Sequence, residues 1–519
     1  MRNPAKHEWL CGAVALLICV FYILTIRSGQ PWGDDFAMYV HETKNLSEGT
    51  PLGKTGYIYN PQRPWVGPKL YPPVFPVLLI PGYLMGGLRD LEPMKLEVVL
   101  CFAGLLVVLW RNLGCELPFS HRAAMLAIVG LNPLVWSFKD LLVSDLPFTL
   151  FVYLTLALSE RIVEVADSSR HRTLQILLLA TSVYLCFGSR TIGIVLVPAL
   201  LLQAILRWRR GGKSIAWAAG IGLALCLLQQ LYLGSETSYA DQLKLSAGKF
   251  VQNIAVYGWS LASYWDNPFS RMFRDLLFVA LAASALAAYV RHLWTGARIY
   301  EIFLPFYLGV VLLYPDPGGP RYLIPVFPLF VCYSLEGFQL LQELPRIHLR
   351  KHFRVVRVAA IMLVFLTYGT EFTRLDFGSF KQGIAKEESQ ELFSYVRENT
   401  NPEDVFVFRK PRALALFTGR SAAVYPLSRD AARTCAYFRT IGASYLIEAP
   451  ELDDGGFDEF VKTLGCLKQE VYQNKDFEIF RLDSPAHNGS SSVAVQSMRG
   501  RAISSRILRE QTPDPCPGR

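Results

Sequence analysis

Long apolar runs recur through most of this chain, and they constrain its fold more than any other feature. A run of roughly 18 apolar residues is long enough to cross the hydrocarbon core of a bilayer as a helix. About a dozen such runs precede residue 372, at residues 9–26, 72–88, 95–110, 121–137, 145–162, 173–188, 190–207, 215–232, 274–291, 299–315, 322–341 and 355–371. Because only 18% of the residues are charged, the sequence predicts a polytopic α-helical membrane protein with about 11–13 membrane helices.

The basic loops indicate how these segments are oriented. Lys and Arg gather in alternate loops, around residues 161–172, 207–213, 291–298 and 346–354, and the positive-inside rule places those loops in the cytoplasm. The first run has no small-residue cleavage site before Arg27, so we expect a retained helix with a cytoplasmic N-terminus. The net charge of +9 then reflects topology and contact with anionic membrane lipids, and no nucleic-acid partner is expected.

The other loops must face outward. They are residues 27–71, the turn before Asp145, the turn at 188–190, residues 233–273, the loop at 315–321 and everything after residue 372. If residues 27–71 are outside and residues 111–122 are inside, the two apolar runs between them make one net crossing. One of those two runs is therefore re-entrant or incomplete, or the loop is assigned to the wrong side.

Composition changes at residue 372 and divides the chain into three parts. Residues 1–371 form the membrane domain, which includes the first outer loop at 27–71. Residues 372–483 predict a small extracytoplasmic α/β domain, with helices near 384–399 and 411–418 and strands near 405–408, 422–425, 444–447 and 477–481. Residues 484–519 are rich in Ser, Arg, Gly and Pro, which predicts a disordered tail.

The ten cysteines are scattered, without a CxxC spacing or a Cys/His cluster. Several lie inside apolar runs, so they are expected to be buried thiols rather than zinc ligands or a disulfide framework. Cys435 and Cys466, in the α/β part, can pair if that part is extracytoplasmic.

An acidic pair, Asp34 and Asp35, lies a few residues beyond the first apolar run. The residues that follow include an apolar set at helical spacing and a polar set between them: Phe36, Tyr39, Val40, Thr43 and Leu46, against Glu42, Lys44 and Glu48. This pattern predicts an amphipathic helix on the membrane surface. Its dipole favours ionised carboxylates in the first turn, so the pair is either only a helix cap or part of a catalytic site.

Three cations share the outward side, where positive charge is disfavoured unless an anion binds it. They are Lys69, Arg190 and Arg321. Asp145 opens a membrane helix from the same side. Taken alone, Asp145 is explained as a helix cap, and Lys69 as a side chain that reaches toward lipid headgroups. Taken together, these residues suggest a site that holds a phosphate beside a carboxylate.

Several short motifs follow one another along this outward side. They are the acidic pair, Asn45-Leu46-Ser47-Glu48-Gly49, Tyr71-Pro72-Pro73, Ser144-Asp145-Leu146-Pro147, Ser189-Arg190 and Arg321-Tyr322-Leu323-Ile324-Pro325. In this order they resemble the motifs of the GT-C membrane glycosyltransferases. More narrowly, they are similar to the bacterial branch of glycosyltransferase family 39, which is related to protein O-mannosyltransferases and to the lipid A aminoarabinose transferases. The resemblance covers residues 9–371, and the α/β part matches only in position.

The resemblance implies an inverting enzyme that moves a sugar from a polyprenyl phosphate carrier to a hydroxyl of a lipid, glycan or protein at the outer face of the membrane. It also implies a carboxylate base in the first loop. The family tyrosine four residues after the base selects Asp35, whereas the acidic pair itself selects Asp34, and Asp35 is slightly favoured. Asp145 would orient the acceptor or the base. The implied phosphate-binding residues are Lys69, Arg190 and Arg321, with Tyr71 and Tyr322 nearby.

A metal cofactor is not carried over with these residues. In the aminoarabinose transferases a glutamate shortly before the proline pair helps to bind a metal. Here Lys69, Leu70 and Tyr71 precede Pro72, so the expected acidic ligand is missing. The sequence therefore predicts no metal ligands, and the family leaves a divalent metal open.

Other kinds of membrane protein fit parts of this pattern. An O-antigen ligase or polymerase also uses polyprenyl-linked sugars, but its distinguishing outer loop comes late, whereas the acidic pair here comes first. A transporter or flippase also has about a dozen helices, yet it usually places ionisable residues near the bilayer midplane rather than at one surface. A noncatalytic scaffold that presents the α/β domain is the remaining alternative.

Overall fold

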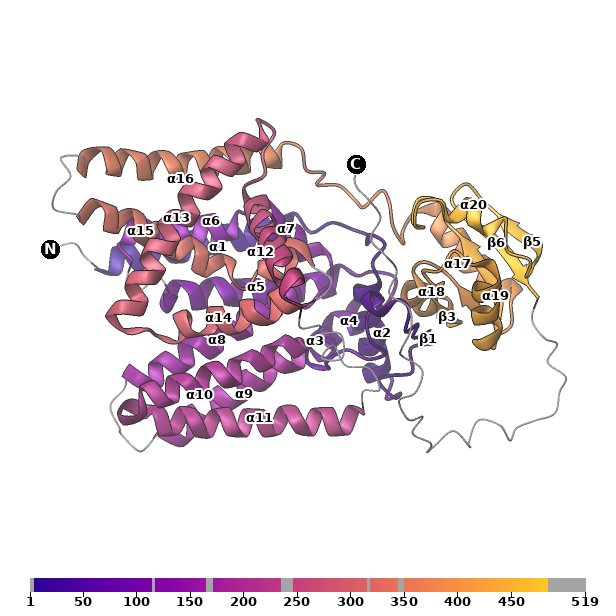
Figure 1. Cartoon of the computed structure of the whole chain (residues 1–519), viewed down its shortest axis with the longest axis horizontal. Coiled ribbons are helices and arrows are strands. Elements are labelled where there is room, and N and C mark those ends of the chain that lie inside the picture. The colour runs from indigo at the N-terminus through magenta and orange to yellow at the C-terminus, as the bar shows by residue number, and fades with distance from the viewer. Residues whose placement is uncertain are drawn as a thin grey trace.

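The computed structural model describes residues 4–113, 117–164, 171–234, 246–314, 318–343 and 350–483. Most of its helices form one bundle, on the left of Figure 1: α1 (Pro4–Leu24), α5 (Glu92–Arg111), α6 (Phe119–Gly130), α8 (Asp145–Glu164), α9 (Arg172–Ser189), α10 (Leu196–Leu206), α11 (Lys213–Leu233), α13 (Arg271–Gly296), α14 (Ile299–Leu313), α15 (Phe327–Glu343) and α16 (Arg350–Phe372). The expected polytopic helical architecture is confirmed. The predicted tail at 484–519 and parts of the predicted inner and outer loops lie outside the described residues.

Six helices of the described chain are long and apolar enough to cross a membrane. They are Glu92–Arg111, Asp145–Glu164, Arg172–Ser189, Trp208–Leu233, Arg271–Gly296 and Val355–Phe372. Three shorter apolar helices, at Trp9–Leu24, Thr191–Leu206 and Ile299–Leu313, coincide with further predicted segments. The chain is therefore a multi-pass membrane protein.

Shorter helices and turns join the long ones. They are α2 (Asp34–Ser47), η1 (Pro64–Val66), α3 (Val74–Leu78), α4 (Ile80–Gly86), α7 (Pro133–Ser137), η3 (Phe138–Asp140), η5 (Thr191–Val195), η6 (Trp208–Gly212), α12 (Ala247–Ala262), η8 (Ser263–Trp265) and η9 (Gly319–Leu323).

The apolar run at 72–88 does not form one long helix, which corrects the expectation of a membrane segment there. It is divided into α3 and α4, of five and seven residues. At about 1.5 Å per residue, seven helical residues rise only about 10 Å, too short to cross a bilayer. This run is the incomplete one, and α5 makes the crossing after it.

One helix was not expected from the sequence. α12 lies in the stretch 233–273, which was predicted as an outer loop, and packs against α14 and η9. The stretch was not predicted as a helix because, at 16 residues, its apolar run is below the length of a membrane helix.

The C-terminal region forms an α/β domain, on the right of Figure 1. Its elements are α17 (Glu387–Asn399), β2 (Val405–Val407), α18 (Pro411–Thr418), β3 (Ser421–Ala423), α19 (Ala431–Thr440), β4 (Ala443–Glu448), α20 (Phe457–Val461), β5 (Leu467–Gln473) and β6 (Glu478–Leu482). Each predicted helix and strand of this region is present. β5 was missed because it is an edge strand, mostly polar and exposed, so it carries little apolar pattern.

The sheet of this domain includes a strand from residues 27–71, the predicted first outer loop. Its order is β1-β3-β2-β4-β6-β5, where β1 is Tyr57–Ile58. β1 pairs in parallel with β3, with Tyr57 opposite Ala422 and Ile58 opposite Ala423. Two residues give no periodic signal, so the sequence could not predict this strand. The first outer loop is thereby built into the C-terminal domain.

A second connection fixes the domain to the bundle. The chain after α1 runs beside the chain that enters the domain: the amide of Phe380 donates to the carbonyl of Ser28 at 3.1 Å, and that of Ile384 to Gln30 at 3.0 Å. The ammonium of Lys95, in α5, donates to the carbonyls of Arg27 and Gly29, both at 2.6 Å. These contacts hold the domain against one end of the bundle, and α2 lies between the domain and the bundle (Figure 1).

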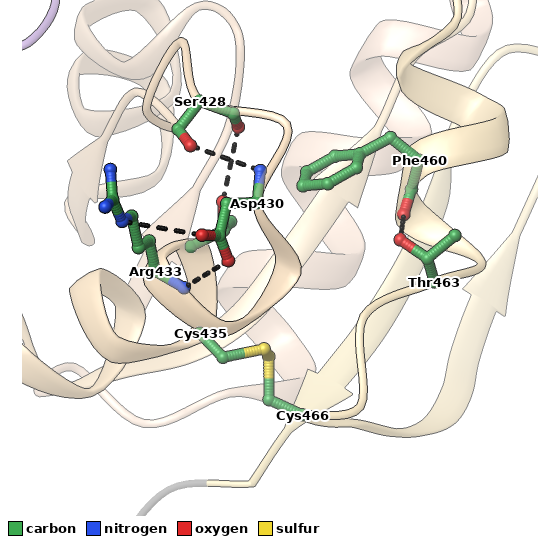
Figure 2. The surroundings of a disulfide bond; sticks show 8 residues. Ser428, Asp430, Arg433, Cys435, Phe460, Thr463 and Cys466 are labelled. Atoms are coloured by element: carbon green, nitrogen blue, oxygen red, sulfur yellow. Dashed lines mark hydrogen bonds and ion pairs between the residues drawn. A yellow bond between two sulfur atoms is a disulfide. The ribbon is translucent and has the colours of Figure 1, made fainter.

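Cys435 and Cys466 form a disulfide, as Figure 2 shows, and it joins α19 to the segment before β5. Replacing both with serine should lower the free energy of unfolding by about 2–4 kcal/mol, because the bond closes a separation of 31 residues. The melting temperature of the purified full-length protein measures this change, with Cys101→Ser, at a free cysteine, as the control. Equal melting temperatures for the double variant and the unmodified protein would contradict the expectation.

Candidate functional site

α2 carries the acidic pair and lies between the bundle and the C-terminal domain. It follows Gly33, whose backbone is extended, and both aspartates lie in its first turn. It packs against α3 and α4 on one side and α18 on the other. This arrangement corrects the expected surface helix: Glu42, expected on the polar face, is fully buried and accepts a hydrogen bond from the Tyr71 amide at 2.7 Å. The other two residues of the expected polar face are less buried: Lys44 is half-buried and Glu48 is exposed.

Arg321, in η9, joins two carboxylates that are far apart in sequence. Its Nη1 donates to Oδ2 of Asp35, and its Nε donates to both oxygens of Asp145, at 3.0 and 2.8 Å. Arg190 forms an ion pair with Asp145 through its own Nη1. Four of the residues predicted from the sequence are thus in one ion-paired cluster.

Helix ends bring these residues together. Asp145 is the first residue of α8, and Arg190 follows the last residue of α9. The hydroxyl of Tyr39, one helical turn after Asp35, lies 2.9 Å from that of Ser144. Carboxylates are favoured at helix N-termini by the helix dipole, so α2 and α8 both stabilise the ionised acids that the arginines bind.

Two tyrosines predicted from the sequence contact these residues. The hydroxyl of Tyr71 donates to Oδ1 of Asp35 at 2.5 Å. The guanidinium of Arg190 lies 5.2 Å from the ring centroid of Tyr322, within the range of a cation–π contact. Tyr71 therefore contacts the carboxylate, whereas Tyr322 supports an arginine.

Arg412, in α18, is a member that the sequence reasoning missed. Its Nη1 donates to the hydroxyl oxygen of Tyr71 at 2.7 Å and lies 3.8 Å from Oδ1 of Asp35. The available signal was its position, since it is the one charged residue in the otherwise apolar helix PRALALFT. We call Asp35, Tyr71, Asp145, Arg190, Arg321 and Arg412 the site cluster.

Within the described part of the chain, Asp34 forms no ion pair with the site cluster, and Lys69 differs from its members in exposure. Oδ1 of Asp34 is buried, and no described residue forms a hydrogen bond with it. Burial raises the pKa of Asp34 above its usual value, against the opposing charges of Lys410 and Arg412. The side chain of Lys69 is exposed, unlike the buried or half-buried members of the cluster.

Charge in the site cluster favours an ionised Asp35. Burial alone would raise the pKa of Asp35, but Arg321 and Arg412, with hydrogen bonds from Tyr71 and Arg321, outweigh it and hold the pKa below its usual value. Asp35 is 30% exposed and Asp145 only 3%, so Asp35 is the carboxylate that a substrate can reach. Three guanidiniums face two carboxylates, which leaves a net positive charge suited to an anion.

The residues of the site cluster do not fit a metal ion. Across the described ranges, no three His, Cys, Asp or Glu side chains lie close enough together to hold one. Both carboxylates are already paired with arginines.

Solved structures share this fold at low sequence identity. ArnT from Cupriavidus metallidurans in the apo state matches with a TM-score of 0.55 and 12% identity, over 92% of this chain and 98% of that chain. The same protein bound to undecaprenyl phosphate matches with a TM-score of 0.51 and 13% identity, over 91% and 97%. AglB, the oligosaccharyltransferase of Archaeoglobus fulgidus, in complex with an inhibitory peptide and a dolichol-phosphate, matches with a TM-score of 0.57 and 11% identity, over 87% and 71%.

These likenesses confirm the GT-C fold expected from the sequence. No protein-family model and no curated protein sequence matches the chain. At identities near one residue in eight, a structural likeness establishes the fold, and function must be argued from the site.

Proposed function

We propose that this protein is an inverting glycosyltransferase. It would move a sugar from a polyprenyl phosphate carrier to a hydroxyl of a lipid, glycan or protein at the outer face of the membrane. The observation that carries the proposal is the reachable Asp35 carboxylate, held among three arginines in a GT-C fold. Two proteins of this fold have been seen with undecaprenyl phosphate and a dolichol-phosphate, which supports a lipid phosphate as the donor here.

In the proposed reaction, Asp35 takes the proton of the acceptor hydroxyl while the oxygen of that hydroxyl attacks the anomeric carbon of the donor sugar. The bond from that carbon to the phosphate oxygen breaks, and the electron pair leaves with the lipid phosphate. Arg321 and Arg190 stabilise the negative charge of this leaving group. Asp145 acts as a positioning residue, because it pairs with both arginines.

The ion pairs also connect donor binding to the base. Without a donor, Arg321 lowers the pKa of Asp35, and a carboxylate with a low pKa accepts a proton poorly. A donor phosphate that binds Arg321 would draw its charge away from Asp35, so the pKa would rise toward its usual value. The base is thereby strengthened when the donor is present.

We infer that the N-terminus is cytoplasmic and that the C-terminal domain is outside. The alternating basic loops support this orientation, and so does the Cys435–Cys466 disulfide, since such bonds persist in oxidising compartments. Free thiols at both positions in protein isolated without reductant would contradict it.

Sugar transfer from a polyprenyl phosphate carrier is the direct test. Purified protein in liposomes is given a panel of radiolabelled polyprenyl phosphate sugars and an extract, containing the lipids, glycans and envelope proteins, of a strain that lacks this protein. We expect the label to move from one of these donors to an acceptor in the extract. Mass spectrometry of glycans and lipids from the deletion strain then identifies the product that is missing. If no polyprenyl-linked sugar is consumed, the proposed function is wrong.

A further inference from the structure

We propose that Arg412 is a positioning residue for the Asp35 base, so that the C-terminal domain completes the active site. The inference rests on the proposed function and extends it to the C-terminal α/β domain. In the sequence, this domain resembles the GT-C glycosyltransferases only in its position. Arg412 reaches Asp35 through Tyr71 and has no direct hydrogen bond with that carboxylate.

The chemistry of the two donors fixes the direction of this relay. A guanidinium only donates hydrogen bonds, so the oxygen of Tyr71 must accept from Nη1 of Arg412, at 2.7 Å. The single hydroxyl proton of Tyr71 is then directed to Oδ1 of Asp35, at 2.5 Å. Arg412 therefore orients Tyr71 toward the carboxylate, and Tyr71 in turn holds the rotamer of Asp35.

Stability alone is a poor reason for an arginine at this position. The side chain is 1% exposed, and burying a guanidinium costs several kcal/mol before its partners compensate. Its Nε atom is buried with no hydrogen-bond partner among the described residues. An apolar side chain would suit the rest of α18 without that cost, so the position of Arg412 is better explained by the group that it serves.

The loop before Tyr71 is shaped around the same contact. Nη2 of Arg412 donates to the carbonyl of Pro68 at 2.7 Å. Gly67 has a φ of +108°, and a Cβ there would lie 2.7 Å from Nη2 of Arg412 and 2.8 Å from the Tyr71 hydroxyl. Glu42 holds the Tyr71 amide at 2.7 Å. Both ends of Tyr71 are thus fixed, the backbone by α2 and the hydroxyl by α18.

The first test separates positioning from folding by kinetics. Arg412→Met is expected to lower kcat by about 10–100-fold with the donor KM changed less than about 3-fold, because Arg412 is only 1% exposed and is not one of the proposed phosphate ligands. Arg412→Lys should retain more activity than Arg412→Met. Arg420→Met is the matched control, because Arg420 also donates several hydrogen bonds but only within its own domain, to Thr400 and Arg397 among others. Its kcat per folded molecule should be unchanged.

A kinetic cycle tests the relay itself. The kcat of the double variant Arg412→Met/Tyr71→Phe is compared with the kcat of each single variant. If Arg412 acts through Tyr71, the kcat of the double variant is at most about 3-fold below that of the slower single variant, because the second substitution removes no further interaction. Rate losses that multiply would overturn the proposal. So would an Arg412→Met protein that is made in lower amount but has an unchanged kcat per folded molecule.

A second cycle needs no substrate. The melting temperatures of the full-length protein, Arg412→Met, Asp35→Asn and the double variant are compared, and Arg412→Met should cost less when Asp35 carries no charge. Additive shifts in melting temperature would also overturn the proposal. If the unmodified protein transfers no sugar, the proposed function fails, and this second cycle still decides whether Arg412 is coupled to Asp35.

Discussion

Asp35→Asn should lower the rate of sugar transfer by about 10²–10⁴-fold, the usual effect of removing a general base. The asparagine keeps the size of the side chain and an oxygen that can accept from the hydroxyl of Tyr71. In the unmodified protein this hydroxyl donates to Asp35 at 2.5 Å. It cannot take the proton of the acceptor. Initial rates with the donor found in the liposome assay measure the loss, normalised to the amount of folded protein.

Asp34→Asn is the matched control, one residue earlier in the same helix turn. Asp34 is not in the site cluster, so its loss should change the rate by less than about 3-fold. A binding measurement with undecaprenyl phosphate distinguishes loss of the base from loss of the phosphate site. Asp35→Asn removes one of the two carboxylates that pair with Arg321, so this arginine is freer to bind a phosphate. The variant should bind that lipid at least as tightly as the unmodified protein. An active Asp35→Asn beside an inactive Asp34→Asn would reverse the assignment of the base.

Arg321→Met should lower kcat/KM by about 10²–10³-fold, the size of effect found when one preorganised charge-stabilising donor is removed. Arg321 bridges Asp35 and Asp145. The substitution therefore removes a proposed ligand of the phosphate, and each of the two carboxylates loses one of its arginine partners. Affinity for undecaprenyl phosphate should also fall. Initial rates and lipid binding measure the two losses separately.

The pH profile of Arg321→Met gives an independent readout. Arg321 lowers the pKa of Asp35, so its removal must raise that pKa. The acid limb of kcat/KM, which reports the base of the free enzyme, is therefore expected to move to higher pH. Arg274→Met, at a partly exposed arginine paired with Asp266 and Asp275, should leave rate and profile unchanged. A variant that is slower at every pH with an unmoved acid limb would contradict the coupling between Arg321 and Asp35.

The long helices could be predicted because the membrane imposes their length and composition. α5, α8, α9 and α13 each contain a predicted apolar run. The exceptions follow from the same rule. The run at 72–88 is apolar enough to be predicted as a membrane helix, but the helix is interrupted at Leu79, between α3 and α4. α12 was not predicted because it is shorter than a membrane span.

The charged residues of the site could be predicted where charge met the membrane, and Tyr71 and Tyr322 only through the family resemblance. Arg190, Arg321 and Asp145 were identifiable because charge at the outer ends of membrane helices is costly without a partner. Arg412 comes from a domain read as soluble, where a single arginine gives no such signal. Its contact with Tyr71 spans 341 positions of sequence, and spacing within one segment cannot predict a pairing of that range. Glu42 was misread because the pattern of α2 does not show that the chain at Tyr71 packs onto it and donates a hydrogen bond.

The strand β1 has a consequence for how the protein is made. Its partner β3 and the contact of Arg412 with Tyr71 come from the far end of the chain, and the latter pair is 341 residues apart. At roughly 5–20 residues per second, a ribosome needs on the order of 20–70 s to add that much chain. During this interval Tyr57 and Ile58 have no sheet to join, and Tyr71, the neighbour of Asp35, lacks the Arg412 side chain that orients it. A nascent chain can therefore insert its first helices without assembling the site cluster, which is complete only after the C-terminal α/β domain has been synthesised.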